Sequence, residues 1–274
     1  MSGAPVVIGS VGPWSGGRVD ELAECVLAPN PSAMTLDGTN TWLVSAPDST
    51  TAVLIDPGPA DPRHLAAVSD AVARRGQRVA TILLTHGHID HSEGARLFSQ
   101  EFSASVSALD PQHRFGGEGL GDGDVVAQAG VELEVVGTPG HSSDSLSFLL
   151  RENGALLTGD TVLGRGTTVV AHPDGRLDEY LASLRRLQRL AQAHTATRLL
   201  PGHGPTAEDP IGLLDAYLVH REERLGQVRE AIGNGASSPA DIVKMVYQPI
   251  PDEVVPAALA SARAQWDYLT AGAV

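Results

Sequence analysis

The sequence predicts an α/β fold in which helices cover the outer faces of β-sheets, followed by a small helical tail. Three observations lead to this prediction. Short apolar runs rich in β-branched residues are separated by turn residues, segments of helical periodicity lie between the runs, and the composition changes after LPGHGPTAEDP, residues 200–210. With 274 residues, 42% of them hydrophobic, the chain can bury the core of one large domain and a small appendage.

Six runs are expected to form strands, because each is short, apolar and bounded by turn residues such as Pro57-Gly58 and Asn153-Gly154. They cover residues 41–46, 51–56, 79–85, 131–136, 146–150 and 155–160. The glycine-rich segment 116–124, GGEGLGDGD, is expected to be a loop and a hairpin turn. Its resemblance to a phosphate-binding GxGxxG loop is weak, because no helix follows it.

Helical periodicity marks residues 61–76 and residues 177–194, where leucines recur three and four positions apart. From Ile211 onward only helices are expected. The first carries a stripe of apolar residues, the second opens at Ser238-Pro239 with Asp241 in its first turn, and the third covers residues 254–269. The sequence thus predicts a main domain over residues 1–206 and a helical domain over residues 207–274.

The composition bears on partners and on cellular location. The formal charge is −14, and Lys244 is the single lysine among 19 basic residues, which argues against a nucleic-acid substrate. No apolar run approaches the roughly 20 residues of a membrane span, and the N-terminus lacks the basic region of a secretory signal. Cys25, the single cysteine, is expected to be a small core residue. These features predict a cytoplasmic protein with no membrane partner.

The segment ILLTHGHIDHSEG, residues 82–94, crowds His86, His88, Asp90 and His91 directly behind an apolar run. Imidazoles two positions apart lie on the same side of an extended segment, and a carboxylate and a third imidazole can turn back toward them. Imidazole nitrogen and carboxylate oxygen are the ligands that zinc and neighbouring metals prefer. An exposed polar turn with accidental histidines is the alternative interpretation.

Three more candidate ligands each stand within a few residues of the end of an apolar run. They are His141 in VVGTPGHSSDSL, Asp160 in LLTGDTVLG and His203 in LLPGHGP. Loops at one edge of a sheet can converge on a cleft, so these residues are expected to lie near the crowded segment. Alone, either histidine would more often be structural than a ligand; together with the segment above, they indicate a metal site.

The motif THGHIDH resembles the HxHxDH signature of the metallo-β-lactamase superfamily, and the three later residues occur in the order of its later motifs. This resemblance implies an αββα sandwich with two metal ions. It assigns one ion to His86, His88 and His141, the second to Asp90, His91 and His203, and a bridging position to Asp160. Asp56, in LIDPG, matches a family aspartate near the site. It is expected to orient a ligand imidazole, with capping of the local turn as the alternative.

The same resemblance implies metal-assisted hydrolysis by a hydroxide shared between two Zn²⁺ ions, with Asp90 and Asp160 taking part in catalysis. Mn²⁺ or Fe²⁺ would fit the same ligands, so the sequence does not identify the metal. No serine or cysteine nucleophile is required, and the chain has no GxSxG elbow.

Departures from known patterns narrow the activity. Asp160 is a residue that dedicated zinc β-lactamases lack, and the Cys-Gly-Arg motif of glyoxalase II and persulfide dioxygenases is replaced by GDTVLGRGTT. The 43 positions between Asp160 and His203 leave no room for the inserted domain of β-CASP nucleases.

Segments such as LDGTNTWLV, LPGHGP and YLVHREERLGQV resemble the β-lactamase-like protein 2 family. That family includes an endoribonuclease and acyl-carrier thioesterases, and its members append a winged-helix-like domain that would match the helical tail. The tail ends short of the β-wing and the basic stretch expected of the nuclease.

Three hypotheses follow. The first is hydrolysis of a small acyl substrate (a thioester, lactam or lactone), the second is cleavage of single-stranded RNA at the same site, and the third is a non-catalytic metal-binding or scaffold protein. Arg165, Thr167 and Thr168 are candidate substrate contacts, with a glycine-flanked turn as the alternative. His113, Arg114 and Phe115 are weaker candidates. The remaining histidines are expected at the surface or at helix ends: His64, His172, His194 and His220. The oligomeric state is not predicted.

Overall fold

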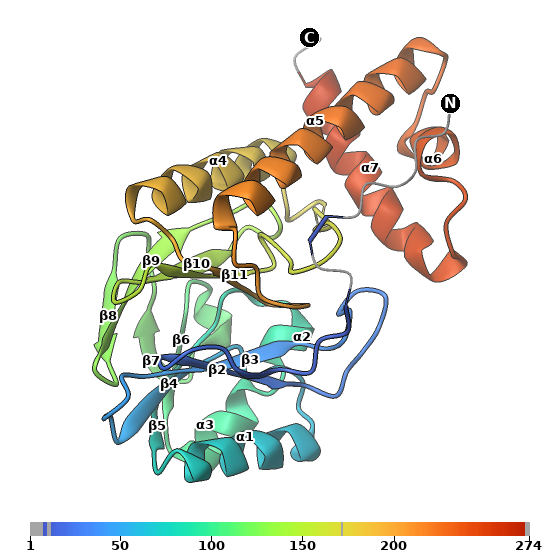
Figure 1. Cartoon of the computed structure of the whole chain (residues 1–274). Coiled ribbons are helices and arrows are strands. Elements are labelled where there is room, and N and C mark those ends of the chain that lie inside the picture. The colour runs from blue at the N-terminus through green and yellow to red at the C-terminus, as the bar shows by residue number, and fades with distance from the viewer. Residues whose placement is uncertain (1–7, 10–11, 171, 272–274) are drawn as a thin grey trace.

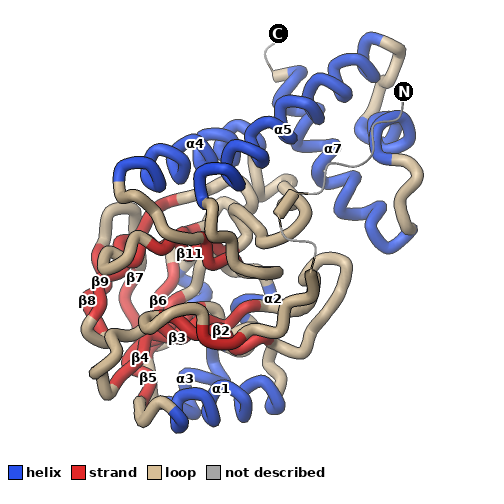
Figure 2. The backbone as a smooth tube through the Cα atoms, in the orientation of Figure 1, coloured by secondary structure: helices blue, strands red, loops and turns tan. Residues whose placement is uncertain are grey.

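Two β-sheets lie face to face at the centre of the molecule, with helices on both outer sides (Figure 1). The computed structural model describes residues 8–9, 12–170 and 172–271. Figure 2 shows the four layers in the order helix, strand, strand and helix, with a helical appendage at one end. This arrangement confirms the αββα sandwich that the family resemblance implies.

The first sheet has seven strands in sequence order. They are β1 (Gly17–Arg18), β2 (Ala23–Leu27), β3 (Asn40–Val44), β4 (Thr51–Ile55), β5 (Arg78–Leu83), β6 (Ser105–Ala108) and β7 (Gly116–Gly119). The strands from β1 to β4 pair antiparallel, and those from β4 to β7 pair parallel. The carboxyl ends of β4 and β5 therefore lie at the same edge of this sheet.

The second sheet has five strands in the order β12 (Leu199–Pro201), β11 (Ala155–Gly159), β10 (Leu146–Leu150), β9 (Val131–Gly137) and β8 (Val125–Gln128). The pairs from β8 to β11 are antiparallel, whereas β11 and β12 are parallel. Asn40 joins the two sheets at one edge, because its side-chain amide donates to the carbonyls of Pro201 (2.9 Å) and Gly204 (2.8 Å).

Side chains alternate between the two faces of each strand, and in the central strands β3, β10 and β11 both faces are buried. On β3, Trp42 and Val44 enter the core between the sheets, while Leu43 packs outward against the helices. On β10, Phe148 enters the central core and Leu149 packs outward. Because both faces need apolar residues, these strands are nearly continuous hydrophobic runs, which is why the sequence marks them so clearly.

Each outer face of the sandwich is covered by its own helices. Over the first sheet lie α1 (Pro62–Arg74) and α3 (Ala95–Phe102), and over the second lie α4 (Leu177–Ala193) and the first half of α5 (Pro210–Gly233). The start of α1 is fixed by Asp61, whose carboxylate accepts a hydrogen bond from the backbone N–H of Arg63 (2.8 Å), with Pro62 in the first turn. Two single 3₁₀ turns span Pro111–His113 and Asp252–Val254.

The tail consists of α5, α6 (Pro239–Ile242), a π-helical turn (Val243–Tyr247) and α7 (Val255–Thr270), as the sequence predicts. The Ser238 hydroxyl accepts from the N–H of Asp241 at the start of α6. No strand is present in the described residues of this tail, so it has no β-wing there. The first half of α5 packs with α4 and the second half packs with α7, so this helix belongs to both cores. The domain boundary at residues 206 and 207 stays a prediction.

All six predicted strands and both predicted main-domain helices are present. One expectation is wrong. The glycine-rich segment is not a simple loop and hairpin, because Gly116–Gly119 pairs with β6 as the edge strand of the first sheet. His64 lies at a helix end, in the first turn of α1, but it is 1% exposed and therefore not at the surface. Along the described chain, each helix is either too short or too polar to cross a lipid bilayer.

Candidate metal centre

The seven predicted ligands lie at one edge of the sandwich, in segments that follow strands. They are His86 and His88 behind β5, Asp90 and His91 on the short helix α2 (Ile89–Ser92), His141 between β9 and β10, Asp160 behind β11, and His203 behind β12. The parallel pairs β4–β5 and β11–β12 direct their carboxyl ends to this edge, which is where binding crevices form in open α/β sheets. The structure thus brings together residues that are up to 117 positions apart in the sequence (203 − 86).

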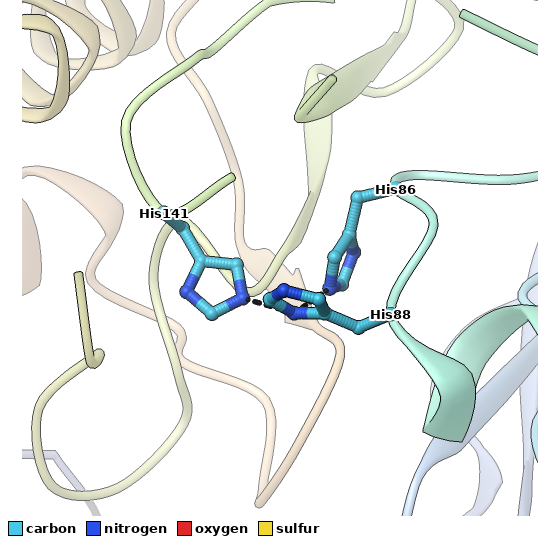
Figure 3. Close-up of side chains that lie close together, drawn as sticks. All are labelled: His86, His88 and His141. Atoms are coloured by element: carbon cyan, nitrogen blue, oxygen red, sulfur yellow. Dashed lines mark hydrogen bonds between the residues drawn. The ribbon is translucent and has the colours of Figure 1, made fainter. Parts of the chain in front are cut away.

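His86, His88 and His141 form the first group of converging nitrogens (Figure 3). Nδ1 of His88 lies 3.0 Å from Nε2 of His86 and 2.9 Å from Nε2 of His141. His86 and His141 are buried and His88 is half-buried. All three ligand atoms lie within 4.8 Å of one another, which is the spacing of donors around one metal ion.

Asp90, His91 and His203 form the second group. Nε2 of His203 lies 3.2 Å from Nε2 of His91 and 3.1 Å from Oδ2 of Asp90. The carboxylate of Asp160 reaches toward both groups, with Oδ2 3.4 Å from Nε2 of His203 and 3.7 Å from Nε2 of His141. This position between the groups is the one that a bridging ligand requires.

Two of these imidazoles use their outward-facing nitrogen to bond to the backbone, which leaves the other ring nitrogen for a metal. Nδ1 of His141 lies 2.6 Å from the carbonyl of Val169, and Nδ1 of His203 lies 3.1 Å from the carbonyl of Gly38. A carbonyl can only accept, so each Nδ1 carries a proton, and Nε2 is the nitrogen of each ring that is directed at the cluster. Metal-ligating histidines are held in this way by partners of their second nitrogen.

Asp56 follows β4 and connects two of the imidazoles. Its Oδ2 accepts from Nδ1 of His91 (2.9 Å) and from the hydroxyl of Thr85 (2.7 Å), and its Oδ1 accepts from the N–H of Thr85 (2.8 Å). Because the Thr85 hydroxyl donates to Asp56, its oxygen accepts from Nδ1 of His86 (3.0 Å). The carboxylate therefore contacts a ligand imidazole and the backbone of Thr85, whereas a capping bond would have to reach the backbone of its own turn. Its orienting role stays a prediction.

The sequence patterns do not identify Thr85 as part of the site, although it directly precedes His86. A hydroxyl beside a ligand is a weak signal, because only the fold shows that it lies between Asp56 and His86. The carbonyls of Val169 and Gly38 could not be found at all, since every residue carries a carbonyl.

In the second group, the negative carboxylates favour positive charge on the neighbouring imidazoles. Burial disfavours the charged form of His91, but the carboxylates of Asp160, Asp56 and Asp90 outweigh it and raise the pKa of His91 well above its usual value. Burial likewise opposes the charge of His203, but Asp160 and Asp90 raise its pKa to about 9. A divalent cation at this position would satisfy the same carboxylates.

The first group lacks this excess of carboxylate. Burial lowers the pKa of His141 to about 4, although Asp160 opposes the shift. Burial and the neighbouring imidazoles lower the pKa of His86 well below its usual value. Imidazole nitrogens whose lone pairs converge on one point repel one another unless a cation lies between them.

The residues present therefore fit divalent metal ions. Oδ1 of Asp160 is buried and accepts no hydrogen bond within the described chain, so it is left for a ligand that the protein does not supply. Gly202 allows the close approach, because a Cβ at that position would lie 2.5 Å from this oxygen and 2.8 Å from Cε1 of His91. Imidazole nitrogen and carboxylate oxygen complete a donor set suited to zinc.

The predicted substrate contacts occupy three different environments. Arg165 pairs with Asp37 (2.7 Å) and donates to the carbonyl of Gly12 (2.8 Å). The Thr168 hydroxyl donates to the backbone carbonyl of Asp160 (2.8 Å), and Thr167 lines a neighbouring cavity. The structure gives Arg165 and Thr168 partners within the protein, and the substrate contacts themselves stay predictions.

The weaker candidates lie in the loop between β6 and β7. His113 packs beside Gly87, where an added Cβ would lie 2.4 Å from Nε2 of His113, so this histidine stands next to the ligand segment. Arg114 donates to the carbonyls of Ala108 and Leu109, and Phe115 lies under the guanidinium of Arg96.

A family model described as the metallo-β-lactamase superfamily matches residues 34–203, a range that contains all seven predicted ligands. The chain belongs to the metallo-β-lactamase superfamily. Members of this superfamily are generally hydrolases, and the fold usually binds divalent metals. In this member of the superfamily, the candidate His and Asp groups could hold such metal ions.

Curated relatives resemble the chain over most of its length. An atrochrysone carboxyl ACP thioesterase of Aspergillus fumigatus is 33% identical over 249 residues, which cover 84% of this chain and 74% of that protein. A β-lactamase-like protein 2 homolog of Drosophila melanogaster is 32% identical over 254 residues, which cover 85% of this chain and 82% of that protein. These matches confirm the resemblance to the β-lactamase-like protein 2 family.

Solved structures agree with the fold. A β-lactamase domain protein from Burkholderia ambifaria superimposes with a TM-score of 0.81 at 22% identity, covering 96% of this chain and 91% of that one. A metallo-β-lactamase family protein from Thermus thermophilus gives a TM-score of 0.78 at 22% identity, covering 93% of this chain and 95% of that one. Because nearly the whole chain is covered, the helical tail belongs to the shared fold.

Proposed function

We propose that this metallo-β-lactamase superfamily member is a dinuclear, zinc-dependent hydrolase of small acyl substrates, with thioesters first among them. The observation that carries the proposal is the carboxylate of Asp160, which lies within 3.7 Å of Nε2 of His141 in one donor group and within 3.4 Å of Nε2 of His203 in the other. A carboxylate between two sets of histidine nitrogens is suited to hold two cations side by side.

The residues of the chain hold and orient the reacting groups. His86, His88 and His141 would bind one ion, Asp90, His91 and His203 the second, and Asp160 both. When bound, the two cations supply an acidified water as nucleophile near neutral pH and a positive charge that faces the carbonyl oxygen of the substrate.

The choice of an acyl substrate is supported by a relative and by charge. The similar Aspergillus protein carries the name of an acyl carrier protein thioesterase. The chain has a formal charge of −14, and a single-stranded RNA held along several phosphates needs several basic contacts. Lactams and lactones present the same electrophilic carbonyl as a thioester, so they belong to the same proposed class.

A parallel turnover assay tests this proposal. Metal-loaded protein is offered an acyl thioester, a chromogenic lactam, a lactone and single-stranded RNA at low and at physiological salt, with metal-stripped protein as the control. We expect metal-dependent thioester hydrolysis that barely changes with salt. RNA cleavage should be slow and should collapse over the same range of salt, because counterion release controls RNA binding.

Efficient, salt-resistant cleavage of RNA with all acyl substrates untouched would replace the proposal with the endoribonuclease alternative. Absence of any turnover by protein shown to contain metal would favour the non-catalytic metal-binding hypothesis instead.

A further inference from the structure

A cavity of about 260 Å³ adjoins the metal centre on the side of the tail. It lies between residues 167–169 and the helices α5 and α7, which are orange and red in Figure 1. Two residues of its wall also contact metal ligands, since Thr168 donates to the carbonyl of Asp160 and Val169 accepts from Nδ1 of His141. The wall of this cavity is therefore bonded directly to two candidate metal ligands, although neither of them lines the cavity itself.

Arg221, on α5, lines this cavity and is 4% exposed. Its Nη2 donates to the carbonyl of Thr168, and its guanidinium lies over the ring of Tyr180 at 4.8 Å. Its Nε is buried and donates to no acceptor in the part of the chain that the structure describes. Within that part, no carboxylate lies within 4.0 Å of this guanidinium.

A buried charge without a counter-charge is costly, so such a group calls for an anionic partner. The neighbouring groups add positive charge instead. Arg224 lines the same cavity one turn further along α5, and its guanidinium donates to the carbonyl of Val246 (3.2 Å). Among the lining residues there is no aspartate or glutamate. This is a local positive site in a chain whose formal charge is −14.

His220 completes the polar side of the cavity and stays neutral there. Burial, reinforced by the positive charges of Arg221 and Arg224, lowers the pKa of His220 to about 4. A neutral imidazole can donate one hydrogen bond to an anion.

The remaining wall is largely apolar and belongs to two separate segments. Met34, which is 48% exposed, comes from the loop before β3, and Ile250, Val254 and Ala257 come from the tail. The cavity is smaller than the 300–1,000 Å³ typical of whole-ligand pockets, so it suits one part of a substrate. That part would combine an apolar segment with an anionic end.

We infer that this cavity binds an anionic group of the acyl substrate, a carboxylate or phosphate joined through an apolar segment to the carbonyl at the metal centre. The inference rests on the proposed function and narrows its substrate class to negatively charged acyl compounds. Arg221 and Arg224 would be the specificity-determining residues, because each presents a guanidinium to an oxyanion. A carboxylate would belong to the acyl part of the substrate and a phosphate to its carrier part.

Matched thioesters test this inference and separate the two sources of charge. One pair compares hexanoyl and adipoyl thioesters of N-acetylcysteamine, which differ in a terminal carboxylate. The second pair compares hexanoyl thioesters of pantetheine and phosphopantetheine, which differ in a phosphate. We expect the metal-loaded protein to favour the anionic member of at least one pair by tenfold or more in kcat/KM, and Arg224→Gln to bring that ratio close to one.

Three more variants complete the design. Arg229→Gln, an exposed position on the same helix outside the cavity, should keep the full ratio. Arg221→Met should lose the ratio and Arg221→Lys should keep part of it, since a cation remains. Arg221→Met loses the bond to Thr168 and can fail to fold for that reason. In that case the ratio measured for Arg224→Gln tests the inference.

Equal kcat/KM within both pairs, or a ratio unaffected by Arg224→Gln, would overturn the inference and leave Arg221 as a structural clamp on residues 167–169. If no thioester is hydrolysed, the proposed function fails. Binding of glutarate and of inorganic phosphate to the metal-loaded protein then tests whether the cavity is an anion site. Binding weakened tenfold by Arg224→Gln but not by Arg229→Gln would sustain the cavity as an anion site. Equal binding in both variants would refute it, as would RNA cleavage that depends on Arg224 without any thioester discrimination.

Discussion

The carboxylate of Asp56 shows how single residues prepare this site. It accepts hydrogen bonds from His91 and Thr85, and Thr85 in turn bonds to His86, so one side chain contacts a candidate ligand of the second group directly and one of the first group through Thr85. Asp56 has a φ of 54°, in the left-handed region, which is uncommon outside glycine. Such a conformation persists where surrounding contacts determine it, here at the edge of the ligand cluster.

Asp56→Asn tests this orientation. The amide keeps the size of the side chain but replaces one acceptor oxygen with a donor, so it cannot accept all three hydrogen bonds that His91 and the hydroxyl and N–H of Thr85 donate to the carboxylate. We expect metal affinity to fall by roughly 10-fold to 100-fold, measured by competition with a chelator. Asp70→Asn, at an exposed position on α1, is the matched control and should bind metal normally. Unchanged affinity in Asp56→Asn would leave this residue with turn capping alone.

Asp160→Ala removes the carboxylate that lies between the two groups. We expect turnover of any substrate to fall by about two orders of magnitude or more, in line with the loss of a key electrostatic contact to the reacting centre. The fold should persist, because Asp160 follows a strand and is not part of the apolar core. Circular dichroism and thermal unfolding check this, with Glu101→Ala on the exposed side of α3 as the control. Near-normal turnover in Asp160→Ala would contradict the mechanism.

At the scale of elements, the main strands and helices could be predicted because each carries a periodic pattern. The strand at residues 51–55 is apolar on both faces, and α4 has leucines at helical spacing. The strand β7 could not be predicted, because Gly116–Gly119 has no apolar pattern and is a strand through its pairing with β6. Tertiary pairing, and not local preference, decides such segments.

His64 illustrates the same limit within α1. It faces the sheet, where its Nε2 lies 2.8 Å from the Thr41 hydroxyl, which donates to the carbonyl of Asp56 (2.6 Å). That hydroxyl has no further proton to give, so Nε2 of His64 is the donor and the ring is neutral. Burial lowers the pKa of His64 to about 4, although Asp61 at the helix start opposes the shift. Polar residues at this depth are hidden from sequence patterns.

A pH-dependent loss of stability follows from this position. The folded pKa of His64 lies below the unfolded value near 6.5, so the unfolded chain binds more protons between those values, and stability falls as the pH drops through this window. We expect this residue to remove about 2 kcal/mol of unfolding free energy between pH 7 and pH 5. His64→Gln, measured by denaturant unfolding, should show a loss that is smaller by this amount.

His194→Gln is the control for that comparison, because His194 is exposed at the end of α4. Its pH dependence should match that of the unmodified protein. If His64→Gln also matched the unmodified protein, the buried neutral state of His64 would be refuted.

At the scale of the whole molecule, the convergence of the seven candidate ligands could be predicted because the crowded segment at residues 86–91 and the three later motifs each follow a strand. The fold brings the ends of these strands to one edge. The cavity beside them could not be predicted. Arg221 is one of three arginines on α5, and its lack of a counter-charge becomes visible only when α5 packs over residues 167–169.

The acidic chain therefore combines three local environments that differ in charge: a carboxylate-rich metal group, an imidazole-rich metal group and a positive cavity. Asp160 follows β11, and Thr168 and Val169 form the cavity wall, so residues 160–169 connect the candidate metal centre and the cavity in one continuous segment.

Zinc is added stepwise to metal-stripped protein, and both the bound metal and the rate of thioester hydrolysis are measured at each step. This titration tests whether two ions act together. Seven ligands with Asp160 between the groups predict that activity rises with added zinc and reaches its plateau at two bound equivalents per chain. The His203→Ala variant should bind one equivalent tightly through the three histidines of the first group and remain nearly inactive. Full activity at one bound equivalent, or hydrolysis that persists without metal, would contradict the dinuclear mechanism.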